Sequence, residues 1–243
     1  MIVPLAVLKR ALGVTGTAED ALLTDLEALA VALASLRGQV DVLAVVCHDM
    51  AEPPACVKAV ADLWVCEPDT RGSAAKLHWA RSWDGYYLAC DDDFMYPTDY
   101  AATMRRWVDA HARRALVVGH GRVLREDAKT FLQAEWFAAP RQANVGGWVN
   151  YPGCCALAFH TDLRVPDRVE GKSMEEPQLA RWAQWTQTPI WLVPHAADWL
   201  QYLLPESAPT IWAEEKGNGF AARNAVIAQQ GRWAVHTPEA AHA

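Results

Sequence analysis

Short apolar runs and helical stripes alternate along the first half of this chain. Leucines recur at intervals of three or four residues from Leu22 to Leu36, as on the apolar face of an amphipathic helix. Further helices are expected at 56–61, 73–83 and 99–114. Five apolar runs have the length and composition of strands, at 2–8, 40–47, 63–66, 86–90 and 115–119.

This exchange of strands and helices predicts an α/β fold with a mostly parallel, Rossmann-like sheet flanked by helices. The pattern is less regular after residue 120. We expect one domain over residues 1–212, with a regular half at about 1–120 and a less regular half at about 121–212. A tail or lid would follow at 213–243, because Gly217-Asn218-Gly219 marks a loop or hinge near its start.

Charge and composition narrow the class of protein. The 243 residues carry a formal net charge of −7, so a broad electrostatic footprint for nucleic acid is not expected. No run approaches the roughly 18 apolar residues that span a bilayer. Lys9 and Arg10 follow the first apolar run instead of preceding it, unlike a secretory signal. Six cysteines without a C-x-x-C pair favour a reduced, cytoplasmic protein and lack zinc-ligand spacing.

The candidate chemistry lies where three of the apolar runs stop, at His48-Asp49, Glu67-Pro68-Asp69 and Asp91-Asp92-Asp93. The carboxyl ends of parallel strands meet at one edge of a sheet, where open α/β folds bind ligands. Adjacent carboxylates repel one another, and a hard cation such as Mg²⁺ or Mn²⁺ would neutralise them together with substrate phosphates. The triplet therefore predicts a metal–diphosphate site. The alternative is a solvated acidic turn that caps the next helix.

Familiar nucleotide motifs are absent: there is no G-x-x-x-x-G-K-[ST] loop and no G-x-G-x-x-G loop after the first strand. Instead, residues 69–76 and 85–100 resemble the nucleotide-sugar half of a GT-A fold glycosyltransferase, most closely the bacterial family 2-like enzymes. The shared features are a GDxGK-type segment, a strand, an acidic D-x-D cluster and a Pro-x-Asp-Tyr helix start. Weaker matches follow in order at 153–160, 173–177 and 190–200.

The resemblance implies a nucleotide-sugar donor, with a UDP-sugar favoured, and Mn²⁺ or Mg²⁺ as cofactor. Asp91 and Asp93 match the D-x-D carboxylates that hold the cation on the diphosphate. Asp92 would reach the donor ribose or sugar. These assignments agree with the chemistry, because a cation neutralises the charge that develops on a diphosphate leaving group.

Four further residues are candidates for the donor side of the site. Asp49 is placed to contact the base or ribose, and Arg71 would contact the diphosphate. Lys76 resembles the family lysine near the nucleotide, although a surface helix lysine is an equal alternative. His195 follows a strand and would be a metal ligand or a diphosphate contact, with a purely structural histidine as the alternative.

The resemblance also implies a general base at the start of a helix. Glu176, with Glu175 as the alternate, matches the acidic residue that deprotonates the acceptor hydroxyl in inverting members. The family residue is usually Asp, whereas this chain has Glu175-Glu176-Pro177. Capping of the helix N-terminus is the alternative role for these glutamates.

The sequence thus predicts a metal-dependent, hexosyltransferase-type enzyme that moves one sugar to a hydroxyl of a glycan or another acceptor, with inversion. Nucleic acid is not favoured as the acceptor. A nucleotidyltransferase-like enzyme is one alternative, although residues 4–13 offer only Lys9, Arg10 and Gly13 for the loop it needs. A degenerate module that binds nucleotide-sugar or glycan without turnover is another, and the altered base motif keeps it open.

Overall fold

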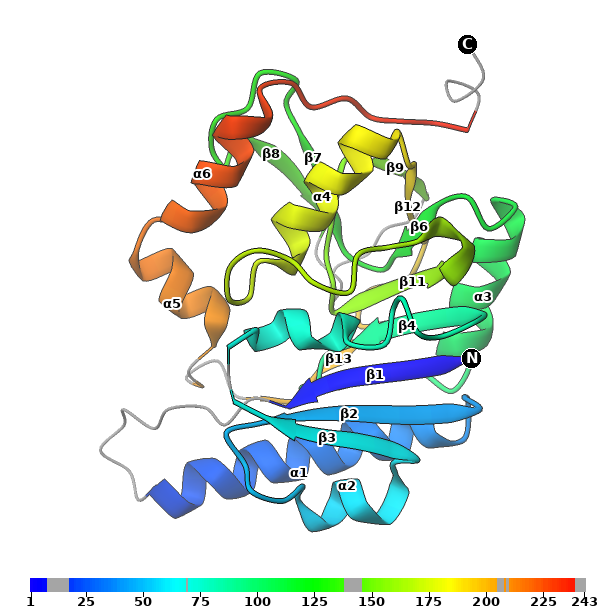
Figure 1. Ribbon diagram of the computed structural model, residues 1–243, viewed down its shortest axis with the longest axis vertical. Coiled ribbons are helices and arrows are strands. Elements are labelled where there is room, and N and C mark those ends of the chain that lie inside the picture. The colour runs from blue at the N-terminus through cyan, green and yellow to red at the C-terminus, as the bar shows by residue number, and fades with distance from the viewer. Residues whose placement is uncertain (8–17, 69, 138–145, 205–207, 209, 239–243) are drawn as a thin grey trace.

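The computed structural model describes residues 1–7, 18–68, 70–137, 146–204, 208 and 210–238, with only the backbone for 4–7 and 18–25. Its centre is an eight-stranded sheet in the order β3-β2-β1-β4-β11-β6-β12-β9 (Figure 1). The strands of this sheet are β1 (Ile2–Val7), β2 (Val42–His48), β3 (Leu63–Glu67), β4 (Tyr86–Cys90), β6 (Leu116–Val118), β9 (Gly147–Val149), β11 (Ala156–His160) and β12 (Ile190–Leu192).

Most neighbouring strands of the sheet run parallel. β1 pairs in parallel with β2 and β4, β2 with β3, and β6 with β12. β11 is antiparallel and lies between β4 and β6, and β9 forms an antiparallel edge. The predicted fold class, a mostly parallel α/β sheet flanked by helices, is confirmed.

Helices cover both faces of the sheet. Successive residues of β4 point to opposite faces, as the pleat of a strand requires. Leu88 and Cys90 join the core that α1 and α3 cover, whereas Tyr87 and Ala89 join the core that η1 and α4 cover. The helices are α1 (Ala18–Arg37), α2 (Ala55–Val60), α3 (Tyr100–Ala110), α4 (Glu175–Thr186), α5 (Ile211–Gly217) and α6 (Ala221–Gln230), with 3₁₀ turns η1 (Gly72–Leu77) and η2 (Thr161–Leu163).

The helix expected at 73–83 is wrong, because the chain forms only the 3₁₀ turn η1 there. Ala75 and Lys76 are both buried although they are adjacent, so the segment has no exposed helical face. Gly72 begins the turn in the left-handed region, at φ +56°, and a Cβ there would lie 2.1 Å from the Ser173 Oγ. The loop before α4 therefore packs directly on the start of this turn, where the Ser173 N–H also donates to the Arg71 carbonyl oxygen at 3.0 Å.

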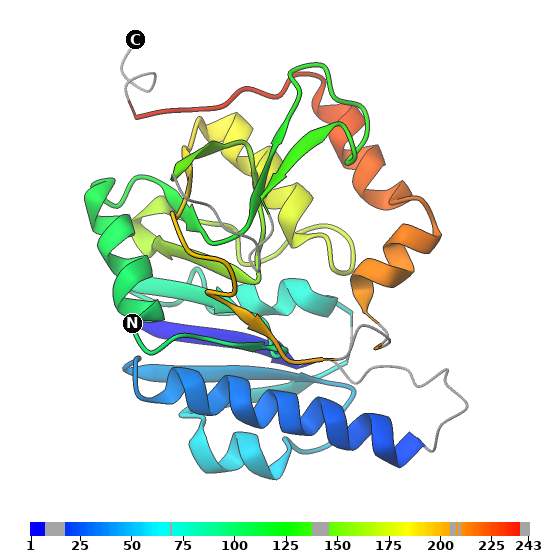
Figure 2. The ribbon, with the colours of Figure 1, turned by 180° about the vertical axis from the view of Figure 1, so that it is seen from behind.

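Two smaller sheets complete the fold: β7 (Gly121–Leu124) lies between β8 (Ala134–Phe137) and β10 (Tyr151–Pro152), and β5 (Phe94–Met95) pairs with β13 (Gln201–Tyr202). In both views β7, β8 and α6 lie at the opposite end of the molecule from α1 and α2, and α5 lies between the two ends (Figures 1 and 2). Phe220, Ile227 and Trp233 share a core with Tyr151 and Ala180. The described part of the expected tail is thus packed on α4, and the domain boundary at residue 212 stays a prediction.

Two sequence expectations concern cysteines and membranes. All six cysteines are free thiols in the structure. Within the described residues, no helix is both long and apolar enough to cross a membrane. Residue 8, the end of the first expected strand, lies outside the described residues.

The central sheet supplies the first testable prediction. Leu43→Ala removes a fully buried side chain from β2, and we expect a loss of about 2–5 kcal/mol in the free energy of unfolding, measured in urea. Leu132, which is 69% exposed, is the matched control, and its change to alanine should stay within about 0.5 kcal/mol. Equal effects of the two substitutions would contradict this placement of the core.

Candidate active site

The candidate site begins where the carboxyl end of β4 meets the start of β11. Cys90 pairs with Ala156 in the antiparallel register, which brings Asp91 beside Cys155. The Tyr96 hydroxyl accepts a hydrogen bond from the Asp91 N–H at 2.9 Å and lies 3.0 Å from the carbonyl oxygens of Asp91 and Cys155. The backbone that carries Asp91 is therefore fixed from both strands.

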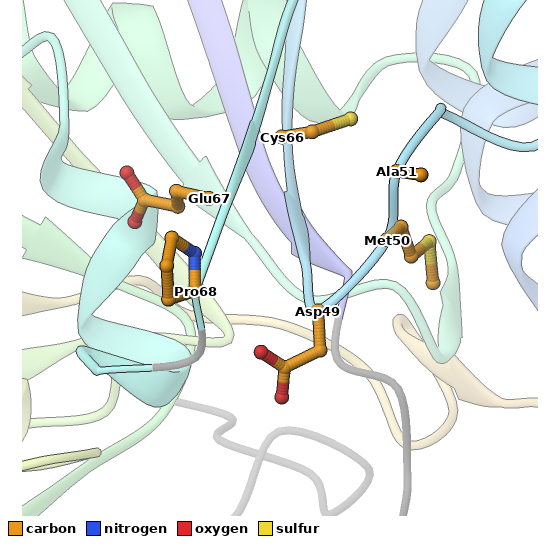
Figure 3. Close-up of a pocket in the computed structure, with 6 residues that line it drawn as sticks. All are labelled: Asp49, Met50, Ala51, Cys66, Glu67 and Pro68. Carbon is orange, nitrogen blue, oxygen red and sulfur yellow. The ribbon is translucent and has the colours of Figure 1, made fainter.

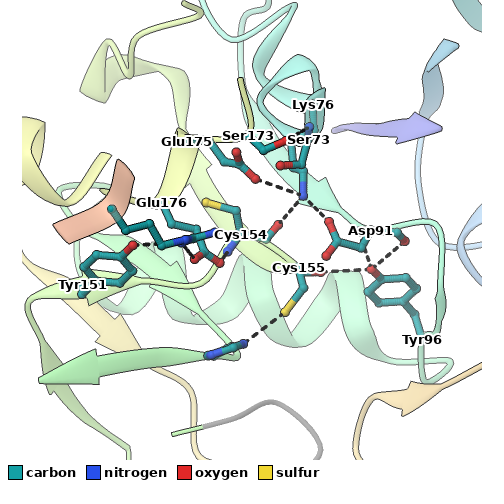
Figure 4. A network of polar contacts seen from close by, with 12 residues as sticks. Ser73, Lys76, Asp91, Tyr96, Tyr151, Cys154, Cys155, Ser173, Glu175 and Glu176 are labelled. Atoms are coloured by element: carbon teal, nitrogen blue, oxygen red, sulfur yellow. Dashed lines mark hydrogen bonds and ion pairs between the residues drawn. The ribbon is translucent and has the colours of Figure 1, made fainter. Parts of the chain in front are cut away.

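Lys76 is the buried cation of this site, with a side chain only 2% exposed. Its Nζ forms an ion pair with Asp91, lies 3.7 Å from the Glu175 Oε1 and lies 3.5 Å from the carbonyl oxygen of Cys154 (Figure 4). Burial opposes the charge, but the attraction of Asp91 and Glu175 raises the pKa of Lys76 well above its usual value. Lys76 is therefore a charged bridge between β4 and the start of α4, not a surface lysine.

Glu175 is less completely neutralised by Lys76 than Asp91 is. Glu175 is only 3% exposed, and its Oε2 is buried with no hydrogen-bond partner among the described residues. Burial raises the pKa of Glu175, and the attraction of Lys76 only partly offsets this. The protonated form of Glu175 is thus favoured more than in water.

Glu176 belongs to a second buried network. One carboxylate oxygen accepts a hydrogen bond from the Cys154 N–H at 3.2 Å, and the other pairs with Arg223 of α6. Arg223 also bonds to the Tyr151 hydroxyl at 3.0 Å and to Glu215 of α5 at 2.6 Å. Burial would raise the pKa of Glu176, but the attraction of Arg223 acts together with the hydrogen bonds from Arg223 and the Cys154 N–H, and the pKa is lowered. Glu176 is therefore ionised at neutral pH.

Asp49 lies in an open pocket of about 270 Å³ at the carboxyl ends of β2 and β3 (Figure 3). It has a left-handed backbone, at φ 52°, and its N–H donates to the Glu67 carbonyl oxygen at 3.0 Å. Met50, Cys66 and Pro68 line the same pocket, so it combines apolar walls with two carboxylates. Such a pocket suits a flat, polar-edged group such as a nucleobase.

Arg71 faces Glu67 of β3, not the acidic triplet. Its guanidinium holds the Glu67 carboxylate by three contacts of 2.7–2.9 Å and lies 2.6 Å from the His78 Nδ1. This places Arg71 next to the Asp49 pocket through Glu67, which Asp49 also contacts. Its role as a diphosphate contact stays a prediction.

The metal ligands expected from the sequence are only partly brought together. Asp93 lies in the turn after β4, two residues beyond Asp91, and its carbonyl oxygen accepts from the Leu203 N–H at 2.9 Å. His195 instead contacts the Gly119 carbonyl oxygen at 3.1 Å and stacks on Trp199. Within the described residues, no contact joins His195 to either aspartate.

The side-chain atoms available as metal ligands show what kind of cation could bind at this edge of the sheet. No group of three His, Cys, Asp or Glu side chains in the described part of the chain is arranged to hold a metal ion. Asp91 and Asp93 nevertheless offer hard carboxylate oxygens, and phosphate oxygens commonly complete the shell of Mg²⁺ or Mn²⁺. The residues therefore fit a divalent cation that is shared with a bound diphosphate. Asp92, in the same turn, is partly buried, and its contact with a donor stays a prediction.

His120 was not among the predicted site residues, yet it lies where the regular half of the domain, at about 1–120, meets the less regular half. Its Nε2 accepts a hydrogen bond from the Trp136 Nε1–H at 2.9 Å, and its Nδ1 lies 3.6 Å from the Cys155 Sγ. An indole N–H only donates, so the Nε2 is unprotonated and His120 is neutral. Burial accordingly lowers the pKa of His120 to about 4.

Arg223 and Tyr151 were also missed as partners of the candidate base. A signal for Arg223 exists in the sequence, because it occupies the helical stripe of Phe220 and Ile227, where a charged residue needs a buried partner. No comparable signal exists for Tyr151, which reaches the site only through the pairing of β10 with β7. Both side chains enter the site by tertiary packing.

Comparisons with known proteins support this picture of the fold. No family model matches the chain, and no curated protein matches it. Among solved structures, the mannosyltransferase PcManGT from Pyrobaculum calidifontis, in complex with GDP-Man and Mn²⁺, aligns over 96% of this chain with a TM-score of 0.53 and 18% identity. The chain has a GT-A glycosyltransferase fold. TarS from S. aureus aligns over 81% of the chain with a TM-score of 0.44 and 10% identity.

The chain is shorter than both of these proteins. It spans 65% of the mannosyltransferase and 58% of the TarS structure. At these identities the likeness shows the fold, while donor, acceptor and stereochemistry require their own evidence.

The pairing of Arg223 gives the second prediction. Arg223→Met leaves Glu176 and Glu215 buried without their cation, and we expect a loss of about 3–5 kcal/mol in the free energy of unfolding at pH 7. Adding Glu176→Gln and Glu215→Gln should restore part of that loss. Arg232→Met is the control, because Arg232 is 78% exposed and its pairing with Glu126 should contribute little. A loss that the two glutamines leave unchanged would argue against the charge network.

The neutral state of His120 gives the third prediction. Its pKa lies near 4 in the folded chain and near 6.5 when unfolded, so the unfolded state binds the proton first as pH falls. Stability should therefore fall between pH 6.5 and 4, by about 2 kcal/mol from this residue at pH 4.5. Denaturation of wild type and His120→Gln at pH 7 and 4.5 measures this, and the variant should show the smaller decrease. Identical decreases would contradict the assignment.

Proposed function

We propose that this protein is a metal-dependent glycosyltransferase that moves one sugar from a nucleotide-sugar donor to an acceptor hydroxyl. The observation that carries the proposal is the convergence of Asp91, Lys76, Glu175 and Glu176 at the carboxyl edge of the sheet, in a fold shared with a mannosyltransferase. That edge is where open α/β sheets bind ligands. The structural neighbour holds GDP-Man, which supports a nucleotide-sugar donor for this chain without deciding between GDP and UDP.

The donor would lie along the carboxyl edge of the sheet. The pocket at Asp49 would hold the nucleoside, and Asp91 with Asp93 would hold Mn²⁺ or Mg²⁺ on the diphosphate. A bound cation would neutralise the charge that develops on the leaving diphosphate. The ion pair with Lys76 holds Asp91 in position, and Asp92 would reach the ribose or sugar. The Mn²⁺ of the structural neighbour supports this choice of cation.

Glu176 is the proposed general base, with Glu175 as the alternate. Glu176 is ionised and is fixed by Cys154 and Arg223, so it can accept a proton from an acceptor hydroxyl during an inverting attack. Its lowered pKa makes it a weaker base, whereas the raised pKa and unpartnered oxygen of Glu175 would make that residue the stronger one. The contact of Glu175 with Lys76 places it closer to the donor side.

One observation favours a second candidate, a module that binds nucleotide-sugar or glycan without turnover. Both oxygens of Glu176 already accept hydrogen bonds and its pKa is lowered, which weakens it as a base toward a hydroxyl. A nucleotidyltransferase gains no such support, because the residues expected to form its loop lie largely outside the described residues. The cytoplasmic location expected from the free cysteines also stays a prediction.

A thermal-shift screen tests the donor site and provides the fourth prediction. UDP, GDP, ADP and their sugar derivatives are added to the wild type with and without Mn²⁺. One nucleotide at 100 times its dissociation constant should stabilise the protein by about 2.7 kcal/mol, a shift of several degrees that depends on the metal. Asp93→Asn should lose the shift, while Asp127→Asn, at a residue whose side chain is 81% exposed, should keep it. The absence of a shift with every nucleotide would overturn the proposal.

A further inference from the structure

Arg122 on β7 is a buried cation without a carboxylate partner in the described part of the chain. It is only 4% exposed, and its guanidinium forms neither a salt bridge nor a hydrogen bond with the described residues. Lys76 and Arg223, the other buried lysine and arginine of the described chain, are both paired with carboxylates. Glu176 attracts Arg122 electrostatically but bonds to Arg223. Buried charges are normally paired, so this guanidinium needs an explanation.

Aromatic rings surround the guanidinium of Arg122. Its central carbon lies 3.9 Å from the ring centre of Phe131, 4.7 Å from that of Trp136 and 5.5 Å from that of Trp212. Cation–π contacts offset part of the cost of burying the charge. Among the described residues the N–H donors of the guanidinium have no hydrogen-bond acceptor, and their planar fork matches the two oxygens of a carboxylate or phosphate.

The two tryptophans also reach solvent. Trp136 and Trp212 stack with ring centres 5.6 Å apart and planes inclined by 21°, and they are 37% and 38% exposed. We call Arg122, Trp136 and Trp212 the aromatic–cation cluster. Exposed indole rings offer flat apolar surfaces on which the C–H face of a pyranose packs, while the sugar keeps its hydroxyls in water.

The aromatic–cation cluster is connected to the proposed base. Trp136 donates to His120, His120 lies against Cys155, and the neighbouring Cys154 N–H donates to Glu176. The cluster is built on β7, β8 and α5, whereas the Asp49 pocket is formed at the ends of β2 and β3. β7 and β8 lie toward the end of the molecule opposite α1 and α2, and α5 lies between the two ends (Figure 1). A ligand on the cluster would therefore approach Glu176 from other elements than those that form the Asp49 pocket.

We infer that the aromatic–cation cluster binds the acceptor, and that this acceptor is a sugar carrying an anionic group, a carboxylate or a phosphate. The pyranose ring packs on Trp136 and Trp212, and the anionic group pairs with Arg122. This inference rests on the proposed function for the meaning of "acceptor". The binding of an anionic sugar to the cluster is a separate property that requires neither nucleotide nor metal.

Three probes with the same ring test the inference: glucose, glucuronate and glucose 6-phosphate. Their affinities for the wild-type protein are measured by saturation-transfer NMR titration, without nucleotide or metal. We expect at least one anionic sugar to bind ten times more tightly than glucose. The better of the two anionic probes identifies the carboxylate or the phosphate as the preferred group.

Variants connect that preference to the cluster. Arg122→Gln should remove the preference for the anionic sugar, and Arg122→Lys should retain part of it, because a lysine keeps the charge but not the bidentate geometry. Trp212→Ala should weaken all three probes at least fivefold. Arg125→Gln and Trp185→Ala are the controls, at a side chain 62% exposed and a residue 65% exposed, and should bind as wild type does.

The outcomes separate the two proposals. Equal binding of all three probes, no binding of any probe to the wild type, or an undiminished preference in Arg122→Gln would overturn the inference. If Arg122→Gln does not fold, the wild-type series together with Arg122→Lys and Trp212→Ala decides the matter. Anionic sugars that bind to a protein that shows no nucleotide-dependent thermal shift would support the cluster and reject the glycosyltransferase proposal.

Discussion

Several acidic side chains are buried or half-buried at one edge of the sheet, and the site depends on their neutralisation. Lys76 bridges Asp91 and Glu175, and Arg223 bridges Glu176 and Glu215. An unpaired carboxylate in this position would cost several kcal/mol, so the two cations make the arrangement possible. Each also joins distant parts of the chain: Lys76 links η1 to β4 and α4, and Arg223 links α4 to the C-terminal helices.

The same charge balance sets different properties for two adjacent glutamates. Burial is the largest effect at both residues: it raises the pKa of Glu175, whereas at Glu176 the attraction of Arg223 and two hydrogen bonds together outweigh it and the pKa is lowered. Adjacent carboxylates held in opposite protonation preferences are a common arrangement where one group must accept a proton. Their placement at the start of α4 also favours negative charge through the helix dipole. Capping and catalysis are therefore compatible roles for these residues, and the structure gives no reason to treat them as exclusive.

The proposed donor site and the proposed acceptor site each contain a buried cation, and the two cations have different surroundings. On the donor side, Lys76 is fully committed to carboxylates, so a diphosphate there would rely on a divalent cation held by Asp91 and Asp93. On the other side, Arg122 has no carboxylate partner among the residues that the structure describes, and it lies among aromatic rings. The two cations thus suit different ligands: Lys76 holds the edge that we propose binds a divalent cation, and Arg122 would offer its own charge to the proposed anionic sugar.

The sequence by itself predicted the mostly parallel sheet, the helices α1, α2 and α3, and the acidic strand ends, because apolar periodicity and strand ends are local properties of the chain. It also identified Asp49, Lys76, Asp91 and the glutamate pair as candidates, through motif order. Only the tertiary structure decided which charges meet. The antiparallel register of β11 brings Cys154 to Lys76 and Glu176, and the packing of α6 on α4 brings in Arg223. Lys76 and Cys154 are 78 residues apart along the chain, and Glu176 and Arg223 are 47 apart. Local sequence patterns do not reveal such contacts, because only the packing of distant segments brings the residues together.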